Sequence, residues 1–156
     1  MFFKFEADFV ESLRCIPMQV RLKLDTCGIK LRLQEWNLFN QEERRILVES
    51  SCETQEEILD YRRRLQGLIF QYTGEMGKEL PIESDPAWLN VKMIDKDVEK
   101  RSQELGICLS LEQWERLEPL QRFALIKLCH SRHENSNFLP ALKEFQLIGE
   151  CEITPG

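Results

Sequence analysis

Apolar residues recur in nearly the same order in two stretches of the chain, residues 28–47 and residues 106–125. Each stretch has a glycine, three alternating apolar residues, a tryptophan and then a helix-like spacing of apolar positions. Trp36 in the first stretch matches Trp114 in the second. A supersecondary pattern that recurs in this way predicts a duplicated architecture. We expect Trp36 and Trp114 to be buried in equivalent surroundings that are related by an approximate internal symmetry.

The residues around the first glycine indicate how this unit is built. Pro17 suits the first turn of a helix, and Gly28 is placed to end that helix in the left-handed conformation. Ile29, Leu31 and Leu33 then alternate with polar residues. We expect an extended connector here, with its apolar side chains packed inward.

The start of the next helix differs between the two stretches. Ser110 and Gln113 form a capping box, in which each side chain satisfies a backbone donor of the other residue. Arg32 stands at the position that matches Ser110, and arginine is not a favoured capping residue. We therefore expect the helix that follows Arg32 to be less well capped.

A third segment predicts the longest helix of the first half. Thr54 and Glu57 form another capping box at its start. The apolar positions that follow have the spacing of an amphipathic helix, and they are Ile58, Tyr61, Leu65, Leu68, Ile69 and Tyr72.

Arg62, Arg63 and Arg64 lie on this predicted helix. Three consecutive helical residues spread over roughly 200°, so these side chains cannot all face one anion. A solvated face is the simple interpretation. Arg62 borders the apolar stripe, which makes it the candidate among the three for contact with a partner.

The second half contains two further predicted helices beside the repeated stretch. Residues 88–105 are expected to form one helix, with its buried side made by Trp88, Val91, Ile94, Val98 and Leu105. The last helix is expected to run through Phe138, Leu142 and Phe145.

These elements predict an all-α protein. We expect a compact helical bundle built from two similar multi-helix halves, 17–73 and 87–148, with an extended N-terminal segment. Residues 74–86 collect glycines, prolines and charges, which is typical of a connector. The whole of 1–156 has the length of one domain.

Charge and hydropathy exclude some partners. The net charge of −6 argues against a general binder of nucleic acid or of an anionic membrane, because phosphate contact needs a concentrated basic face. No apolar run is long enough to cross a bilayer, and the first residues lack the order of a signal peptide. We expect a cytoplasmic protein, in which most of the six cysteines are small buried apolar residues.

The N-terminus gathers aromatic side chains at Phe2, Phe3, Phe5 and Phe9. One interpretation is that these rings lie over the core. The other is an exposed docking arm, since large apolar patches left in water usually mark an interface. Phe2, Phe3 and Phe5 therefore join Arg62 as candidates for partner contact.

Cys129, His130 and His133 form the segment with the most candidate chemistry. Cys129 and His133 would share one face of a continuing helix, and Cys52 matches His130 in the repeat. A zinc site needs four ligands, or three and an open position, and the sequence supplies no second compact ligand pair. The competing interpretation is a helix end at which His and Arg complement the dipole. We predict no metal site and no cofactor, with these four residues as the only candidates for a metal.

Other enzyme signatures are missing from the sequence. The phosphate-binding, dinucleotide-binding, nucleophile-elbow and zinc-protease motifs do not occur. We assign no catalytic residue and predict that the protein is not an enzyme.

Three stretches carry a resemblance to a known family. They are residues 2–36 (FFKFEADFVESLRCIPMQVRLKLDTCGIKLRLQEW), residues 109–128 (LSLEQWERLEPLQRFALIKL) and residues 137–145 (NFLPALKEF). Together they resemble the cyanobacterial nitrate reductase associated protein family, and FEADF and RCIPMQVRLKLDTCGIKL are the most specific parts. The resemblance implies a non-catalytic accessory factor for a molybdenum-dependent assimilatory nitrate reductase. It transfers no catalytic motif.

The leading hypothesis is therefore a chaperone-like accessory or maturation factor. Its partner would be the nitrate reductase or a protein that inserts the molybdenum cofactor, and its oligomeric state stays open. The alternative is a metal- or redox-active carrier that uses the Cys129–His133 segment. A small enzyme of the molybdopterin pathway is a third hypothesis, although no sequence feature locates its pocket.

Overall fold

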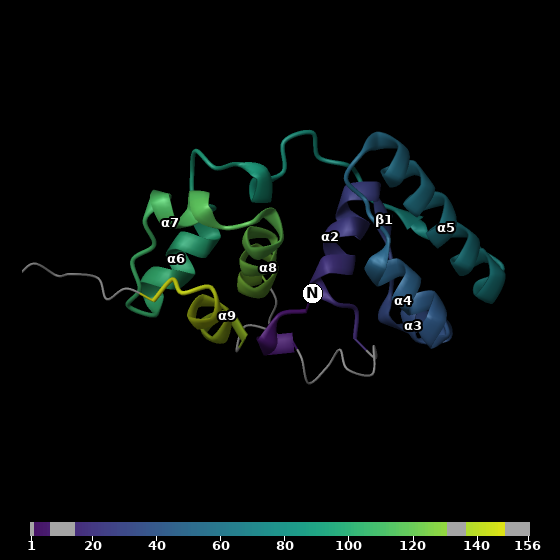
Figure 1. Cartoon of the computed structure of the whole chain (residues 1–156), viewed down its shortest axis with the longest axis horizontal. Coiled ribbons are helices and arrows are strands. Elements are labelled where there is room, and N and C mark those ends of the chain that lie inside the picture. The colour runs from purple at the N-terminus through teal and green to yellow at the C-terminus, as the bar shows by residue number, and fades with distance from the viewer. Residues whose placement is uncertain (1, 7–14, 131–136, 149–156) are drawn as a thin grey trace, which may run out of the picture. The chain divides into compact units, whose positions relative to one another are not determined.

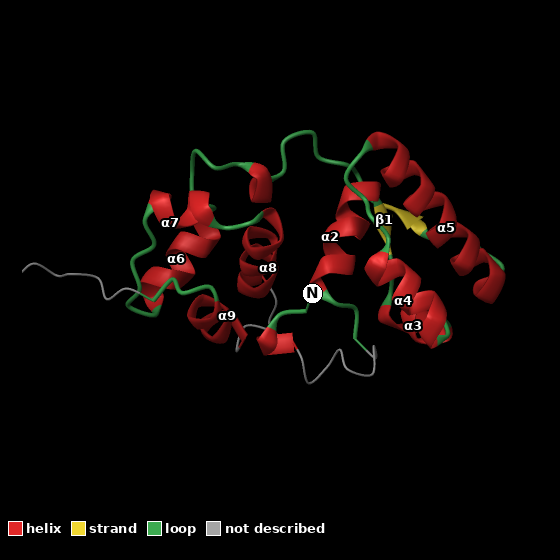
Figure 2. Ribbon diagram, in the orientation of Figure 1, coloured by secondary structure: helices red, strands yellow, loops and turns green. Residues whose placement is uncertain are grey.

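The structure, a computed structural model, describes residues 2–6, 15–130 and 137–148. Across these residues helices dominate, and the strands form one short antiparallel pair (Figures 1 and 2). The prediction of an all-α protein is confirmed. Near the N-terminus, where we expected an extended segment, the described residues include a 3-10 helix, η1 (Lys4–Glu6). No helix in these three ranges is both long and apolar enough to span a membrane.

Backbone contacts group the chain into two units. Unit 1 extends to Ser84 and unit 2 begins at Asp85, while residues 3–5 group with unit 2. The division falls inside the expected connector, 74–86. The single domain and the two similar halves stay predictions.

Unit 1 combines helices with the strand pair. Its elements after residue 15 are α2 (Met18–Cys27), β1 (Ile29–Lys30), α3 (Leu33–Leu38), α4 (Gln41–Glu49), α5 (Gln55–Thr73) and β2 (Lys78–Glu79). The two strands pair with Ile29 opposite Glu79. Part of the expected connector therefore forms a strand of unit 1.

The core of unit 1 lies where α2 and α3 pack against α5. The box at the start of α5 is confirmed, because Thr54 Oγ1 accepts from the Glu57 N–H and Glu57 Oε1 accepts from the Thr54 N–H. The core contains Val20, Leu24, Cys27, Ile29, Leu31, Trp36, Phe39, Leu47, Cys52, Tyr61, Leu65 and Ile69. The predicted stripe of α5 is thus buried at its centre, whereas Tyr72 near the end of the helix is exposed.

Gly28 ends α2 as predicted. Its φ of 77° lies in the left-handed region, and a Cβ there would sit 2.7 Å from Ile82 Cγ1 and 3.0 Å from Leu80 O. A side chain at this position would therefore strain the backbone and collide with residues that follow β2. The connector after it is only partly as expected: Ile29 and Leu31 are buried, but Leu33 is 49% exposed because it is already the first residue of α3.

In the described residues, the regular elements of unit 2 are helices. They are η2 (Ala87–Leu89), α6 (Lys96–Glu104), α7 (Leu111–Arg116), α8 (Pro119–His130) and α9 (Phe138–Glu144), and the first two residues of η1 also group with this unit. α8 packs against η2, α6 and α9. The Ser110–Gln113 box is confirmed, with Ser110 Oγ accepting from the Gln113 N–H and Gln113 Oε1 accepting from the Ser110 N–H.

The prediction of one helix over 88–105 is wrong. The chain makes only η2 and then no regular structure until α6 begins after Asp95. Two backbone carbonyls in this interval accept hydrogen bonds from side chains instead of from the backbone N–H groups of a helix. Trp88 O accepts from Arg122 Nε at 2.6 Å, and Asn90 O accepts from Trp114 Nε1 at 2.8 Å. Asp95 then caps α6, which sets a new helix start inside the predicted one.

The two tryptophans are buried as predicted. Trp36 and Trp114 are both 0% exposed, and each is followed eight residues later by an arginine that donates to the tryptophan carbonyl at 3.1 Å. α3 and α7 each end after six residues, and Gly28 and Gly106 share a positive φ. The local geometry of the repeated stretch therefore recurs in each unit. A symmetry that relates the units stays a prediction.

Candidate functional site

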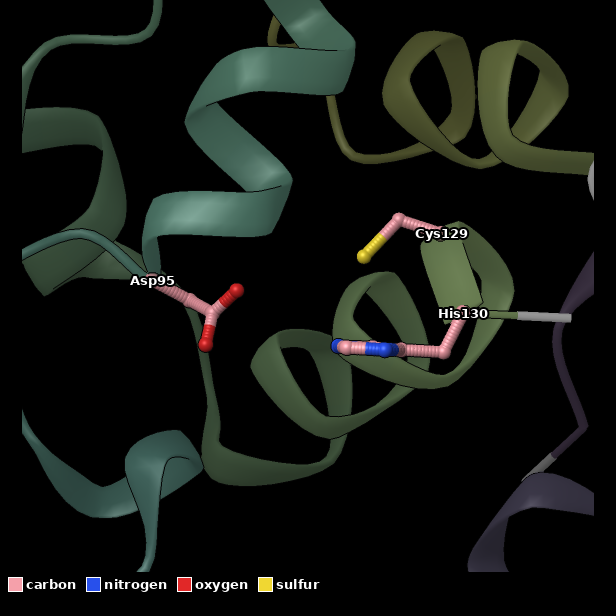
Figure 3. Close-up of side chains that lie close together, drawn as sticks. All are labelled: Asp95, Cys129 and His130. Atoms are coloured by element: carbon pink, nitrogen blue, oxygen red, sulfur yellow. The ribbon is translucent and has the colours of Figure 1, made fainter.

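Three polar side chains of unit 2 converge between α6 and α8. The potential ligand atoms of Asp95, Cys129 and His130 all lie within 4.8 Å of one another. Figure 3 shows the sulfur of Cys129 and the ring of His130 directed from the last turn of α8 towards Asp95. We call these three residues the α6–α8 cluster.

Asp95 is fixed by its role at the start of α6. Its Oδ1 accepts hydrogen bonds from the Asp97 N–H at 3.0 Å and from the Val98 N–H at 3.1 Å. Aspartate is a favoured N-cap because it satisfies backbone donors that have no partner in the first turn. The cap uses Oδ1, so Oδ2 is the oxygen that remains for a ligand.

Cys129 and His130 are the last two residues of α8. The Cys129 thiol lies 3.1 Å from Ile126 O and is partly buried. The His130 side chain is 54% exposed, and its Nε2 lies 3.1 Å from Asp97 Oδ2. The helix end thus presents a sulfur and a ring nitrogen towards two carboxylates of α6.

The surroundings of Cys129 favour its neutral thiol. The pKa of this thiol is raised to about 12, first by burial and then by the charges of Asp95 and Asp97, against a smaller opposing effect of Arg101. The nucleophile in thiol chemistry is the thiolate, so Cys129 is a poor nucleophile near neutral pH. The negative charges of Asp95 and Asp97, which disfavour a thiolate at Cys129, would favour a bound cation.

The structure brings together two of the four residues that the sequence singled out for a metal. Cys129 and His130 belong to the α6–α8 cluster, whereas Cys52 is buried in the core of unit 1. His133 lies outside the described residues. Sequence reasoning missed Asp95, because the helix predicted over 88–105 hid the N-cap that places it.

A second feature is a shallow groove on the exposed side of α5, which we call the α5 groove. It is lined by Leu59, Arg62, Arg63, Gln66, Gly67, Phe70 and Met76, and its surface is mainly apolar. Leu59, Phe70 and Met76 are each more than half exposed. These side chains lie off the predicted buried stripe, and sequence reasoning missed them because it followed only that stripe.

Hydrogen bonds hold one wall of the α5 groove against the helix. Gln66 Oε1 accepts from the Gly77 N–H at 2.6 Å, and Gln66 Nε2 donates to Gly77 O at 3.2 Å. A Cβ on Gly77 would lie 2.6 Å from Ile69 Cδ1, so a larger residue here would have to displace the Ile69 side chain. The loop that carries Met76 is therefore pinned to α5.

Arg62 has a structural role that the sequence did not reveal. Its Nη1 donates to Cys27 O at 2.6 Å, at the end of α2, and its Nη2 lies 2.7 Å from Glu79 Oε1 of β2. It thus ties α5 to both elements while lining one edge of the α5 groove. Arg63, in contrast, has an 82% exposed side chain.

Some of the N-terminal aromatic side chains are buried and others are exposed. Phe3 stacks on Phe5 with ring centroids 5.2 Å apart, and its ring meets that of Phe145 edge-on at 5.1 Å. Phe3 is buried, whereas Phe2 is 37% exposed. The cluster of Phe3, Phe5 and Phe145 belongs to unit 2, and Phe9 lies outside the described residues.

The comparisons with known proteins point to one family. A search of curated proteins and of solved structures finds no match to the chain. The family model described as "conserved nitrate reductase-associated protein" matches residues 2–145. That description names association with the reductase and not reductase activity itself. Because the match spans almost the whole sequence, the chain belongs to the conserved nitrate reductase-associated protein family.

Proposed function

We propose that the protein is a non-catalytic accessory or maturation factor for a molybdenum-dependent assimilatory nitrate reductase. It works in the cytoplasm by protein–protein contact, with the reductase or a cofactor-insertion protein as its partner. The family match over residues 2–145 is the observation that carries the proposal. The sequence also lacks the usual catalytic motifs, which fits a partner protein better than an enzyme.

The α5 groove is the contact surface that we propose. Exposed apolar side chains that surround a hollow are typical of protein-binding surfaces, and aromatic residues such as Phe70 often dominate the binding energy. The occupant would be an apolar segment of the partner, with an acidic group near Arg63. Arg62 would contact the same segment from the edge of the groove. Phe2, with its exposed ring, stays a separate candidate.

Gly67 supports a binding role for this face. It lies in the middle of α5, where glycine costs about 1 kcal/mol relative to alanine. Packing does not require it, because a Cβ at this position would meet no described atom within 4 Å. Gly67 instead keeps the centre of the α5 groove open.

Binding of the purified reductase to groove variants tests the contact. Leu59→Gln and Phe70→Gln change exposed side chains, so the fold should survive, and each should weaken binding about tenfold. Gly67→Leu should fill the groove and weaken binding while leaving the helix intact. Leu33→Gln is the matched control, since Leu33 is 49% exposed and Leu59 56% exposed. Equal affinity for all four variants and the wild type would rule out the α5 groove.

A deletion strain tests the function separately from the surface. We expect a reductase that is low in activity when this protein is absent, and its molybdenum content then distinguishes the two routes. A metal-free enzyme indicates a role in cofactor insertion, and a metal-replete but inactive enzyme indicates a role in folding or electron delivery. Full activity and full molybdenum content in the deletion strain would refute the accessory function.

A further inference from the structure

We propose that Asp95, Cys129 and His130 bind a divalent transition-metal ion of the Zn²⁺ class. The proposal concerns unit 2 alone and does not rest on the accessory function. It rests on three different donor side chains, from two packed helices, that are directed into one space (Figure 3).

The donor geometry is close to that of a bound site. Donor atoms around a tetrahedral zinc ion with bonds of about 2.0–2.3 Å lie roughly 3.3–3.8 Å apart. The three donors of the α6–α8 cluster lie within 4.8 Å of one another before any ion is added. A small rotation of the exposed His130 side chain and of the Asp95 carboxylate would close the difference.

The donor types select the class of ion. Sulfur and imidazole nitrogen beside one carboxylate suit zinc and similar transition metals, whereas calcium and magnesium prefer sites made of oxygen. Three protein ligands with an open fourth position are the arrangement of non-structural zinc sites. We therefore expect an exchangeable ion rather than one that the fold requires.

Asp97 gives His130 the outer contact that metal-binding histidines usually have. Such a histidine commonly gives its second ring nitrogen to a carboxylate, which orients the ring. Asp97 Oδ2 already lies 3.1 Å from His130 Nε2, so an ion held by Nδ1 would preserve this contact. Asp97 is thus a positioning residue for the site.

The local charges favour a cation on balance. Asp95 and Asp97 face the site from α6, and the end of α8 adds the partial negative charge of its last carbonyls. The start of α6 and the guanidinium of Arg101 act in the opposite direction, although Arg101 Nη1 also lies 3.1 Å from Glu104 Oε2. When the ion binds, the Cys129 thiol gives its proton to solvent and the sulfur becomes a thiolate ligand.

Cobalt(II) provides a direct spectroscopic test on the full chain. A Co²⁺ ion bound by Cys129 gives a thiolate-to-cobalt charge-transfer band in the near ultraviolet, and added Zn²⁺ should abolish this band. We expect one Co²⁺ per chain. Cys129→Ser should remove the band, while Cys15→Ser, a change to another free cysteine, should keep it.

Two further variants separate ligation from folding. Asp95→Asn keeps an oxygen that can cap α6 but loses the charge, and His130→Gln changes an exposed side chain. Each should lower the Zn²⁺ affinity about tenfold or more, with an unchanged melting temperature in the absence of metal. A Co²⁺ band that persists in Cys129→Ser, or unchanged Zn²⁺ affinity in both other variants, would overturn the proposal. The absence of any band from the wild type would overturn it as well.

Discussion

Arg44 and Arg122 occupy matching positions of the two tryptophan-containing stretches, yet their surroundings differ. Arg44 donates to Trp36 O and Asn37 O, and its guanidinium lies over the Trp36 ring. Arg122 is only 4% exposed, and burial lowers its pKa. It donates to the carbonyls of Trp88, Trp114 and Leu117.

This difference shows how one local motif can serve two purposes. In unit 1 the arginine closes the turn after its own tryptophan. In unit 2 the arginine does the same and also fixes a distant segment that has the 3-10 helix η2 but no α-helix. The comparison predicts that matched substitutions have unequal effects in the two units.

The largest expected difference is between Arg122→Met and Arg44→Met. Methionine keeps the apolar stem but removes every donor. Trp114 O would keep the Leu117 N–H as a donor, but Trp88 O and Leu117 O would lose the donor from Arg122. Buried carbonyls that lose their donor cost about 1–3 kcal/mol each, so Arg122→Met should lower the free energy of unfolding by about 3 kcal/mol. Arg44→Met should lower it by about 1 kcal/mol, because water can reach Asn37 O.

Urea unfolding gives the total change, and hydrogen exchange resolved by peptide shows which unit is affected. Exchange should rise in residues 85–95 for Arg122→Met but not for Arg44→Met. Equal losses in the two variants would remove the distinction between the two arginines.

The next largest difference in stability is expected between alanine substitutions of Gly28 and Gly106. Gly28 and Gly106 have φ values of 77° and 75°, so alanine should cost about 1–2 kcal/mol of backbone strain at either position. A Cβ at Gly28 also meets Ile82 and Leu80 O, whereas a Cβ at Gly106 meets no described atom within 4 Å. We expect Gly28→Ala to destabilise by roughly 3 kcal/mol and Gly106→Ala by about half as much.

Melting temperatures and urea midpoints of the two alanine variants check this expectation. Ile82→Ala in the Gly28→Ala background is the internal control, because it removes the nearest clash and should recover part of the loss. A larger effect at Gly106 than at Gly28 would contradict the role of the contacts with Leu80 and Ile82.

The smallest difference in stability is expected at the N-terminal caps of α3 and α7. Glu35 Oε1 accepts from the Arg32 N–H at 2.9 Å, but arginine has no acceptor to return the bond, so only half of a capping box exists there. Arg32→Ser would add the missing cap but lose the ion pair between the exposed Arg32 and the buried Glu35, so we expect a net stabilisation of only about 0.5 kcal/mol. Ser110→Ala should destabilise by about 1 kcal/mol.

Urea unfolding of the two cap variants and of the wild type measures these changes in stability. A loss of stability in Arg32→Ser would mean that the arginine side chain contributes more than a serine cap can. No change in Ser110→Ala would mean that α7 does not depend on its box.

Features governed by neighbours in the sequence were predictable. Gly28, the two capping boxes and the stripe on α5 each depend on residues within one or two helical turns, and the structure contains all of them. The burial of Trp36 and Trp114 followed from their matched positions and large apolar area.

Features governed by distant residues were not predictable. The break of the 88–105 helix depends on Arg122 and Trp114, which bind carbonyls of Trp88 and Asn90 from a later part of the chain. One local signal was present: Asp95 followed by an acidic first turn is typical of a helix start. It could have located both α6 and the third member of the α6–α8 cluster.

The bond between Arg122 and Trp88 O has a consequence for the order of events during synthesis. The two residues are 34 positions apart, and the donor is made after the acceptor. When residues 85–95 leave the ribosome, the arginine that fixes them has not yet emerged. This segment therefore passes through a period of exposure on every nascent chain, and unit 2 can reach its native arrangement only after α8 has emerged.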